Sequence, residues 1–304
     1  MKFAPSIPLF ALGLGLLPAT GCVVAVDSHS EIQREEKRFT VDGTPDVRVA
    51  TFDGSIHVQA WDKPGITVEI EKRGPSKETV EALQVIVEQK GNVIDLEVKR
   101  PKNESFSRIG FQQAAYARLV VWVPRLSNIR ARSGDGSIRI ERVSGRLDLR
   151  TGDGSIRAAE VSGDMTFDTG DGSVVVESAE GQLVVDTGDG SVNVSGSLSA
   201  VKLHTGDGSV VYRATPGSSM TKGWDITTGD GSVTLYLPRD FGADIDAHTG
   251  DGRITNDLDV PLERPDRERS REERERRTLR GQIGAGGHLL RVRTGDGAIR
   301  LKLN

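Results

Sequence analysis

An 18-residue repeat is the feature of this 304-residue chain that most restricts its fold. The motif Ser/Thr-Gly-Asp-Gly recurs at this constant period, with its first glycine at Gly134, Gly152, Gly170, Gly188 and Gly206. Later copies start at Gly229, Gly250 and Gly295, and an earlier fragment of the motif is Asp53-Gly54. Self-similarity at a fixed period indicates an architecture in which each unit covers its neighbour.

Each 18-residue unit carries two pairs of apolar residues at constant positions. The first pairs are Ile138/Ile140, Ile156/Ala158, Val174/Val176 and Val192/Val194. The second pairs are Leu147/Leu149, Met165/Phe167, Leu183/Val185 and Val201/Leu203. The two apolar residues of each pair are two positions apart in the sequence, and many of them are β-branched. Both features predict β-strands. A second glycine turn, such as Val143-Ser144-Gly145, separates the two pairs, so each unit is two short strands and two turns.

Two all-β architectures fit this pattern. In an antiparallel meander each Asp-Gly would be a hairpin turn, but no second sheet or helix is available to cover the resulting apolar face. In a β-solenoid each unit is one coil, and equivalent residues stack about 4.8 Å apart. The solenoid seals its own thin core, which agrees with an aromatic content of only 5%. We therefore predict an all-β, β-helix-like solenoid with two short strands per 18-residue coil.

The composition of the repeated turn follows from backbone geometry. Glycine adopts positive φ without a steric penalty, and aspartate tolerates it better than most residues. The neighbouring Thr or Ser hydroxyls can form hydrogen bonds from coil to coil. We therefore expect hydroxyl ladders along this corner.

The N-terminus resembles a bacterial export signal with a lipid attachment site. Residues 1–21 contain Lys2, an apolar stretch from Ile7 to Leu17 that is too short to span a bilayer, and then small residues. The only cysteine, Cys22, follows them at the position where a lipobox thiol would be acylated, although Ala19 stands where leucine is usual. We predict a lipoprotein exported to the outer membrane, periplasm or cell surface, with residues 22–37 as a lipidated flexible tether.

The remaining chain divides into two regions. Residues 38–130 contain several strand-like runs and one short helical candidate, Ser76 to Gln84, and we expect them to form an irregular β cap. Residues 131–304 form the predicted Gly-Asp-Gly solenoid. A charged segment, residues 263–280, interrupts it and is expected to be a solvated loop before the last coil.

Composition excludes several protein classes. Forty Lys and Arg against 44 Asp and Glu give a net charge of −4, which excludes a nucleic-acid binder held by bulk positive charge. No apolar run approaches the ~20 residues of a membrane-spanning helix, which excludes a polytopic membrane protein. One cysteine excludes internal disulfides and multi-cysteine zinc sites.

The aspartate row Asp135, Asp153, Asp171, Asp189 and Asp207 is the main candidate for a metal site. Calcium β-rolls also place aspartates in glycine turns, and their coils have the same length. Calcium takes six to eight oxygen ligands, however, and this repeat supplies one carboxylate per coil. Turn chemistry therefore explains the row without an ion, and we predict no cofactor.

No residue set predicts catalysis. His204 and His248 lie in the same register as Asp168 and Asp186, so stacking would bring His204 beside Asp186, but no third partner completes the pair. His29, His57 and His288 have no partner in the sequence, and the chain contains neither Gly-x-Ser-x-Gly nor His-Glu-x-x-His. We therefore predict that the protein is not an enzyme.

The segment VPRLSNIRARSGDGSIRIERVSGRLDLRTGDGSI resembles the β-strand repeat of the putative-adhesin family DUF4097, whose function is unknown. The ending GQIGAGGHLLRVRTGDGAIRL is similar to the final strands of that family, and the resemblance covers about residues 40–304. It implies a β-solenoid and surface adhesion, and it carries over no binding residues.

Our leading hypothesis is a non-enzymatic cell-envelope lipoprotein. Its partners would be the membrane, through Cys22, and a protein or glycan ligand bound at the outer face or the hydroxyl corner. The alternatives are an envelope structural or signalling module that acts through protein contacts, and a calcium-binding β-roll.

Overall fold

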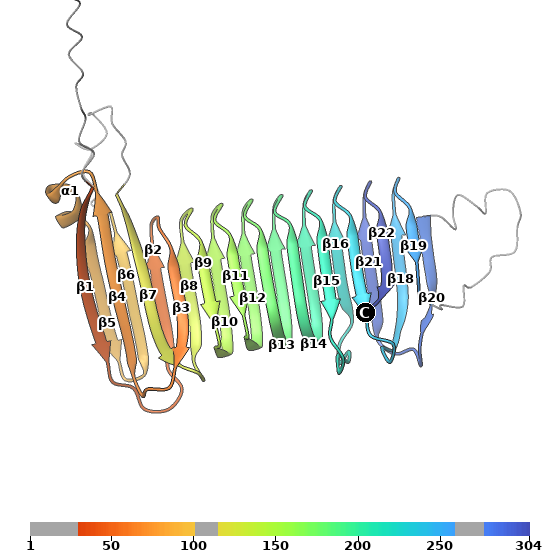
Figure 1. Ribbon diagram of the computed structural model, residues 1–304, viewed down its shortest axis with the longest axis horizontal. Helices are drawn as coiled ribbons and strands as arrows, with labels where there is room; N and C mark the ends of the chain where they lie inside the picture. The colour runs from red at the N-terminus through yellow and green to blue at the C-terminus, as the bar shows by residue number, and fades with distance from the viewer. Residues whose placement is uncertain (1–29, 101–114, 259–276) are drawn as a thin grey trace, which may run out of the picture.

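The computed structural model describes residues 30–100, 115–258 and 277–304. Within these ranges the chain is almost entirely β, with one five-residue helix, α1 (Lys77–Glu81). Figure 1 shows the strands side by side in one long row, with α1 at one end. The hydrogen-bond pattern separates the strands into two ladders, here called ladder A and ladder B, whose inward side chains form a shared core.

In spatial order, ladder A contains β5 (Gln84–Lys90), β6 (Val93–Lys99), β2 (Asp46–Thr51), β8 (Asn128–Ser133), β10 (Ser144–Thr151), β12 (Ser162–Thr169), the second halves of β13 (Val174–Thr187) and β14 (Val192–Thr205), β16 (Trp224–Thr228), β21 (Leu289–Thr294), β18 (Ala243–Thr249) and β20 (Thr278–Ile283). Ladder B contains β1 (Glu31–Phe39), β4 (Ile66–Gly74), β7 (Tyr116–Pro124), β3 (Ile56–Trp61), β9 (Ile138–Glu141), β11 (Ile156–Ala159), the first halves of β13 and β14, β15 (Val210–Ala214), β17 (Val233–Leu237), β22 (Ile299–Leu303) and β19 (Ile254–Asn256).

The stacking predicted from the repeat is confirmed. Ile138, Ile156, Val174 and Val192 are direct neighbours in consecutive parallel strands. All four are essentially inaccessible to solvent. Burial of each such aliphatic side chain contributes about 1.5–3 kcal/mol before the entropy cost of folding. Because successive units pair in parallel, the meander alternative is wrong.

Aromatic side chains cluster in the core of the C-terminal half, where the sequence predicted a thin aliphatic core. Tyr212, Trp224 and Phe241 are buried there, with ring centroids 5.1 Å (Tyr212 to Trp224) and 5.0 Å (Trp224 to Phe241) apart. The repeat also lengthens here, because the step from Gly206 to Gly229 is longer than the regular steps that precede it. The regular coils bury one aromatic ring, Phe167, so the clustering of three rings coincides with the longer connections.

The chain order differs from the spatial order at both ends. The coil formed by β2 and β3 lies between the β6–β7 coil and the β8–β9 coil. The C-terminal coil, β21 and β22, lies between the β16–β17 coil and the β18–β19 coil. The prediction that the array closes on its last coil in sequence is therefore wrong, since β18, β19 and β20 form that end.

Three predicted boundaries also change. Residues 31–37 belong to β1, which pairs with β4, so the expected tether 22–37 is wrong from Glu31 onward. The expected cap 38–130 already contains a solenoid coil, with Asp53-Gly54 at its turn. In the charged segment, Thr278 to Arg280 lie in β20 rather than in a loop, because they pair with β18; residues 263–276 lie outside the described residues.

The N-terminal end is covered by polar and charged groups. Helix α1 is capped by Ser76, whose hydroxyl accepts a hydrogen bond from the backbone N–H of Thr79, and it packs against β1 and β4. Beside it, Lys72 is 5% exposed and its Nζ lies 2.7 Å from a carboxylate oxygen of Glu35. The hydrogen bond from Lys72 lowers the pKa of Glu35. Charged groups at the end of a sheet oppose edge-to-edge pairing with another chain.

Candidate binding surfaces

The predicted hydroxyl ladder exists, but it points into the protein. Each repeat threonine donates hydrogen bonds to two glycine carbonyls of the adjacent coil; for example, Thr169 Oγ1 lies 3.1 Å from the oxygen of Gly152 and 2.8 Å from that of Gly154. The same pair of bonds is made by Thr151, Thr187, Thr205, Thr228, Thr249 and Thr294. These threonines are 0–6% exposed. The expectation that the hydroxyl corner binds a ligand is therefore wrong for the threonine column.

The aspartates of the same corner face solvent. The five predicted residues, Asp135, Asp153, Asp171, Asp189 and Asp207, are all exposed, as are Asp230, Asp251 and Asp296 in the later copies. Within the part of the chain that the structure describes, no three His, Cys, Asp or Glu side chains are grouped so that they could hold a metal ion. The corner therefore offers a row of single carboxylates, one per coil.

Charge on the outer faces is segregated along the solenoid. Residues 125–157 carry eight arginines against four acidic residues, whereas residues 158–212 carry nine acidic residues against one lysine. Some arginines are neutralised locally, as Arg130 and Arg150 are by Asp148. The coils that contain β8, β9 and β10 are therefore basic and the coils that follow them acidic, although the chain as a whole is nearly neutral.

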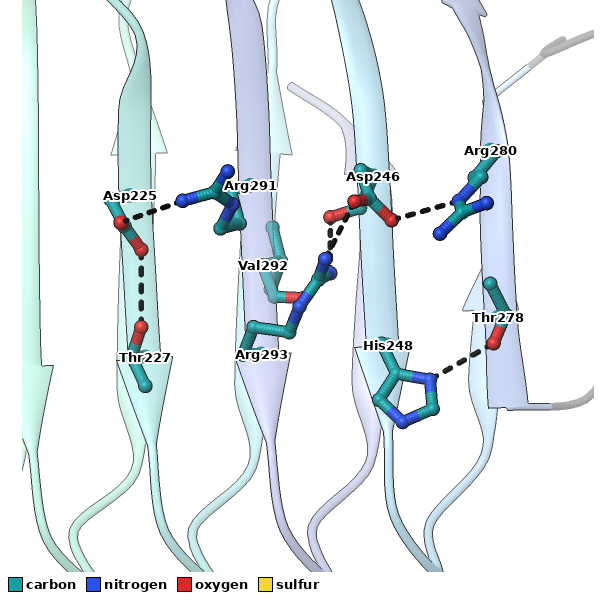
Figure 2. A network of polar contacts seen from close by, with 9 residues as sticks. All are labelled: Asp225, Thr227, Asp246, His248, Thr278, Arg280, Arg291, Val292 and Arg293. Carbon is teal, nitrogen blue, oxygen red and sulfur yellow. Dashed lines mark hydrogen bonds and ion pairs between the residues drawn. The ribbon is translucent and has the colours of Figure 1, made fainter.

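A network of ion pairs joins the strands at the C-terminal end of ladder A (Figure 2). Asp246 on β18 lies 2.6 Å from Arg293 on β21 and 3.3 Å from Arg280 on β20. Partial burial opposes ionisation of Asp246, but the two guanidinium groups outweigh it and lower the pKa of the carboxyl. A separate ion pair on the other side of β21 joins Arg291 to Asp225 on β16, at 3.7 Å. These contacts fasten the out-of-order strand β21 to both of its neighbours.

The histidines do not form a catalytic set in the described residues. His204 lies beside Asp186, as stacking requires, and beside Thr227 on its other side. His248 makes a hydrogen bond of 2.9 Å with Thr278. The sequence missed a partner for His57, whose Nε2 lies 3.8 Å from Glu141; partial burial lowers the pKa of His57 against the opposing effect of that carboxylate. His29 lies outside the described residues.

The sequence also missed a pair of tryptophans on the outer face of ladder B. Trp61 at the end of β3 and Trp122 on β7 are both half-buried, with ring centroids 6.3 Å apart and planes inclined by 32°. In the register of the sheet, Trp122 lies between Gln59 and Thr67. Parallel pairing of β3 with β7 could not be read from the chain, because the two side chains lie far apart in the sequence and outside the regular repeat.

Two hollows adjoin this tryptophan pair. One, of about 530 Å³, is lined by both rings together with Glu36, Arg38, Lys63, Thr67 and Glu69, among others. The other, of about 420 Å³, shares both rings and adds Gln59, Asp62, Arg125 and Arg142. Both volumes are within the usual range for small-ligand sites. We call the two rings and these hollows the Trp61–Trp122 surface.

The predicted lipid attachment residue, Cys22, lies outside the described residues. Among residues 30–100, 115–258 and 277–304, no helix has the length and apolarity required to cross a bilayer.

These features define a class of protein, an all-β parallel solenoid with glycine-aspartate corners and polar outer faces. The Toastrack DUF4097 family matches residues 46–302, and the chain belongs to that family. The family resemblance found in the sequence and the all-β solenoid prediction are both confirmed.

The solved structures that resemble this chain share little of its sequence. A putative adhesin from Bacteroides fragilis is 14% identical, covers 88% of this chain and 97% of its own, and has a TM-score of 0.42. A putative adhesin from Parabacteroides distasonis is 11% identical, with coverage of 88% and 97% and a TM-score of 0.40. A putative cell adhesion protein from Clostridium sporogenes is 14% identical, with coverage of 90% and 100% and a TM-score of 0.30. Comparison with curated proteins gives no match.

Proposed function

We propose that this protein is a non-enzymatic cell-envelope lipoprotein whose rigid solenoid presents a ligand-binding outer surface. The single observation that carries the proposal is the Trp61–Trp122 surface, where two large aromatic side chains remain only partly buried beside hollows lined by polar groups. An aromatic cluster on an outer face is typical of an interaction site. Surface adhesion, which the family resemblance implies, is one role that such a site would serve.

The anchor is the second part of the proposal. Acylation of Cys22 would hold the chain at a membrane, because each buried methylene contributes roughly 0.8 kcal/mol. β1 begins shortly after Cys22 in the sequence, at the end of the solenoid that also carries Trp61 and Trp122. The tryptophan pair would therefore lie near the membrane-proximal end of an anchored rod.

Two measurements test these parts separately. Cells that express the full chain are labelled with a palmitate analogue and fractionated, and we expect label and membrane association that Cys22→Ala abolishes. Adhesion of the same cells to host cells and to other bacteria is compared with that of cells expressing Trp61→Ala/Trp122→Ala. Label without tryptophan-dependent adhesion would favour the structural or signalling alternative, and a thermal shift in millimolar calcium would favour the calcium β-roll.

A further inference from the structure

We propose that the Trp61–Trp122 surface binds a carbohydrate chain, with a sugar ring stacked on the indole rings and its hydroxyls bound from both sides. This inference rests on the proposed function, since it names the class of ligand that the outer surface takes.

The first argument is the placement of the tryptophans. The chain has three, and Trp224 is 1% exposed in the core. The other two come from different strands to the same outer face and stay partly accessible to solvent. Their position gives up part of the hydrophobic stabilisation that Trp224 gains by full burial. An indole offers a wide apolar face, which complements the C–H face of a pyranose ring.

The second argument is that the site is held in place before any ligand arrives. The indole N–H of Trp61 donates a hydrogen bond to the carbonyl of Gly65, 3.1 Å away, which fixes the ring against its own turn. Trp122 is fixed by its position between β3 and β4. Rigid aromatic side chains provide contact area at a low cost in conformational entropy.

The third argument is the chemistry on the two sides of the rings. Glu69 and the side-chain carbonyl of Gln59 can accept hydrogen bonds, whereas Arg125 and Arg142 can donate them. Glu36 and Arg38 line the same surface as an ion pair with each other. A sugar hydroxyl is both donor and acceptor, so a polyhydroxyl ligand satisfies both kinds of group. Four basic and three acidic side chains line the two hollows, so charge alone selects neither an anion nor a cation.

Two other ligand classes fit less well. A quaternary ammonium ligand would be repelled by the positive charge of Lys63, whose Nζ lies 5.1 Å from the centroid of Trp61; a neutral sugar would not be. A proline-rich peptide could stack on the rings, but its prolines supply no backbone N–H to pair with the carboxylates of Glu36 and Glu69. The observations therefore favour a carbohydrate.

The experiment uses the full chain, purified in detergent, on a printed array of host oligosaccharides and bacterial envelope glycans, including lipopolysaccharide core and peptidoglycan fragments. We expect binding to at least one class of glycan. Trp61→Ala and Trp122→Ala should each weaken it about ten-fold or more, and Trp61→Phe, which keeps a ring, should weaken it less. The array also shows whether the sugar comes from the envelope or from a host cell.

Tyr236→Ala is the matched control, because Tyr236 is a half-buried aromatic residue on the outer face of the same ladder, distant from Trp61. It should change glycan binding less than two-fold, and unchanged melting temperatures should show that all variants fold. Binding to no glycan, or glycan binding that survives both tryptophan substitutions, would overturn the inference. Tryptophan-dependent binding of a proline-rich decapeptide without glycan binding would do the same.

The failure of this inference can be distinguished from that of the proposed function. Tryptophan-dependent cell adhesion without glycan binding would overturn only the ligand class. If neither tryptophan-dependent cell adhesion nor glycan binding is found, the binding function itself would be overturned.

Discussion

Thr187 and Gly172 are joined by a hydrogen bond across neighbouring coils, with Oγ1 of Thr187 donating to the glycine carbonyl 3.0 Å away. Thr187 is 1% exposed, and the same hydroxyl lies 3.2 Å from the carbonyl oxygen of Gly170. The relationship recurs at each regular corner of the solenoid. The repeat motif is therefore a unit of interlocking turns, in which each threonine satisfies carbonyl groups of the coil beside it.

Thr187→Val tests how much this hydrogen bond between coils contributes to stability. Valine keeps the shape of threonine but cannot donate, so the buried carbonyl of Gly172 loses its partner, and we expect a loss of about 1–3 kcal/mol in the free energy of unfolding. Denaturant titration followed by circular dichroism measures it. Thr166→Val on β12, which is exposed, is the control and should cost less than about 0.5 kcal/mol. Equal effects of the two substitutions would contradict a stabilising role of the Thr187 hydrogen bond.

Gly190→Ala tests the close approach of consecutive corners. The positive φ predicted for the repeat glycines is wrong for Gly190, whose φ is not positive; its lack of a side chain is required because the adjacent coil lies too close for a Cβ. A Cβ at Gly190 would lie 2.0 Å from the carbonyl oxygen of Gly172 and 2.7 Å from Oγ1 of Thr187. Backbone on one side and a locked hydroxyl on the other cannot both move away, so we expect a loss of about 3 kcal/mol or more, at the upper end for overpacking. Gly217→Ala, where nothing lies within 4 Å of the new atom, should cost only about 1 kcal/mol for its positive φ. A melting temperature of Gly190→Ala at or above that of Gly217→Ala would refute this account.

Asp246→Asn tests the ion-pair network at the C-terminal end. Because Arg293 and Arg280 lower the pKa of Asp246 in the folded protein, the carboxylate stabilises the fold above its unfolded pKa of about 3.9. That contribution, about 1 kcal/mol or less for a partly exposed group, is lost as the pH falls through the lower, folded pKa. The stability difference between wild type and Asp246→Asn should therefore be full at pH 6 and shrink below pH 4.

The control for this pH dependence is Asp225→Asn. Asp225 pairs with Arg291 of the same strand β21, but it lies 3.7 Å from this single arginine and its side chain is 42% exposed. Its substitution should change stability less at every pH. A difference for Asp246→Asn that grows as the pH falls would have the wrong sign for a carboxylate stabilised by arginines.

Excision of one regular coil tests the independence of the repeats. Removal of residues 152–169 joins Thr151 to Gly170 and leaves β10 to pair with β13 in the same register. In a solenoid each unit contacts only its neighbours, so the shortened chain should fold with one cooperative melting transition.

Truncation after Ile283 is the matched comparison, because it also removes one coil, β21 and β22. That coil lies between β16 and β18, so its loss leaves a gap of about two strand spacings, roughly 9.6 Å, inside ladder A. We expect the truncated chain to lose cooperative melting or to aggregate. Equal stability of the two shortened chains would mean that the position of the β21–β22 coil between two earlier coils does not contribute to stability.

The regular middle of this protein is encoded locally. The fixed 18-residue spacing and the two-residue alternation of Ile138 with Ile140 specify strand, register and parallel stacking, because a slip of one residue would turn each apolar pair outward. The motif also predicted the hydroxyl ladder, although not that Thr187 and its equivalents would be buried.

Contacts between non-consecutive units set the remaining features. The local sequence does not specify that β2 pairs with β8, or that β21 lies between β16 and β18. An exposed ladder edge can pair with any strand whose inward side chains are apolar and whose outward side chains are polar. The same holds for the outer surface, where Trp61 and Trp122 become neighbours only through the pairing of β3 with β7. Periodicity encodes a core that repeats, whereas a site that occurs once depends on how distant segments meet.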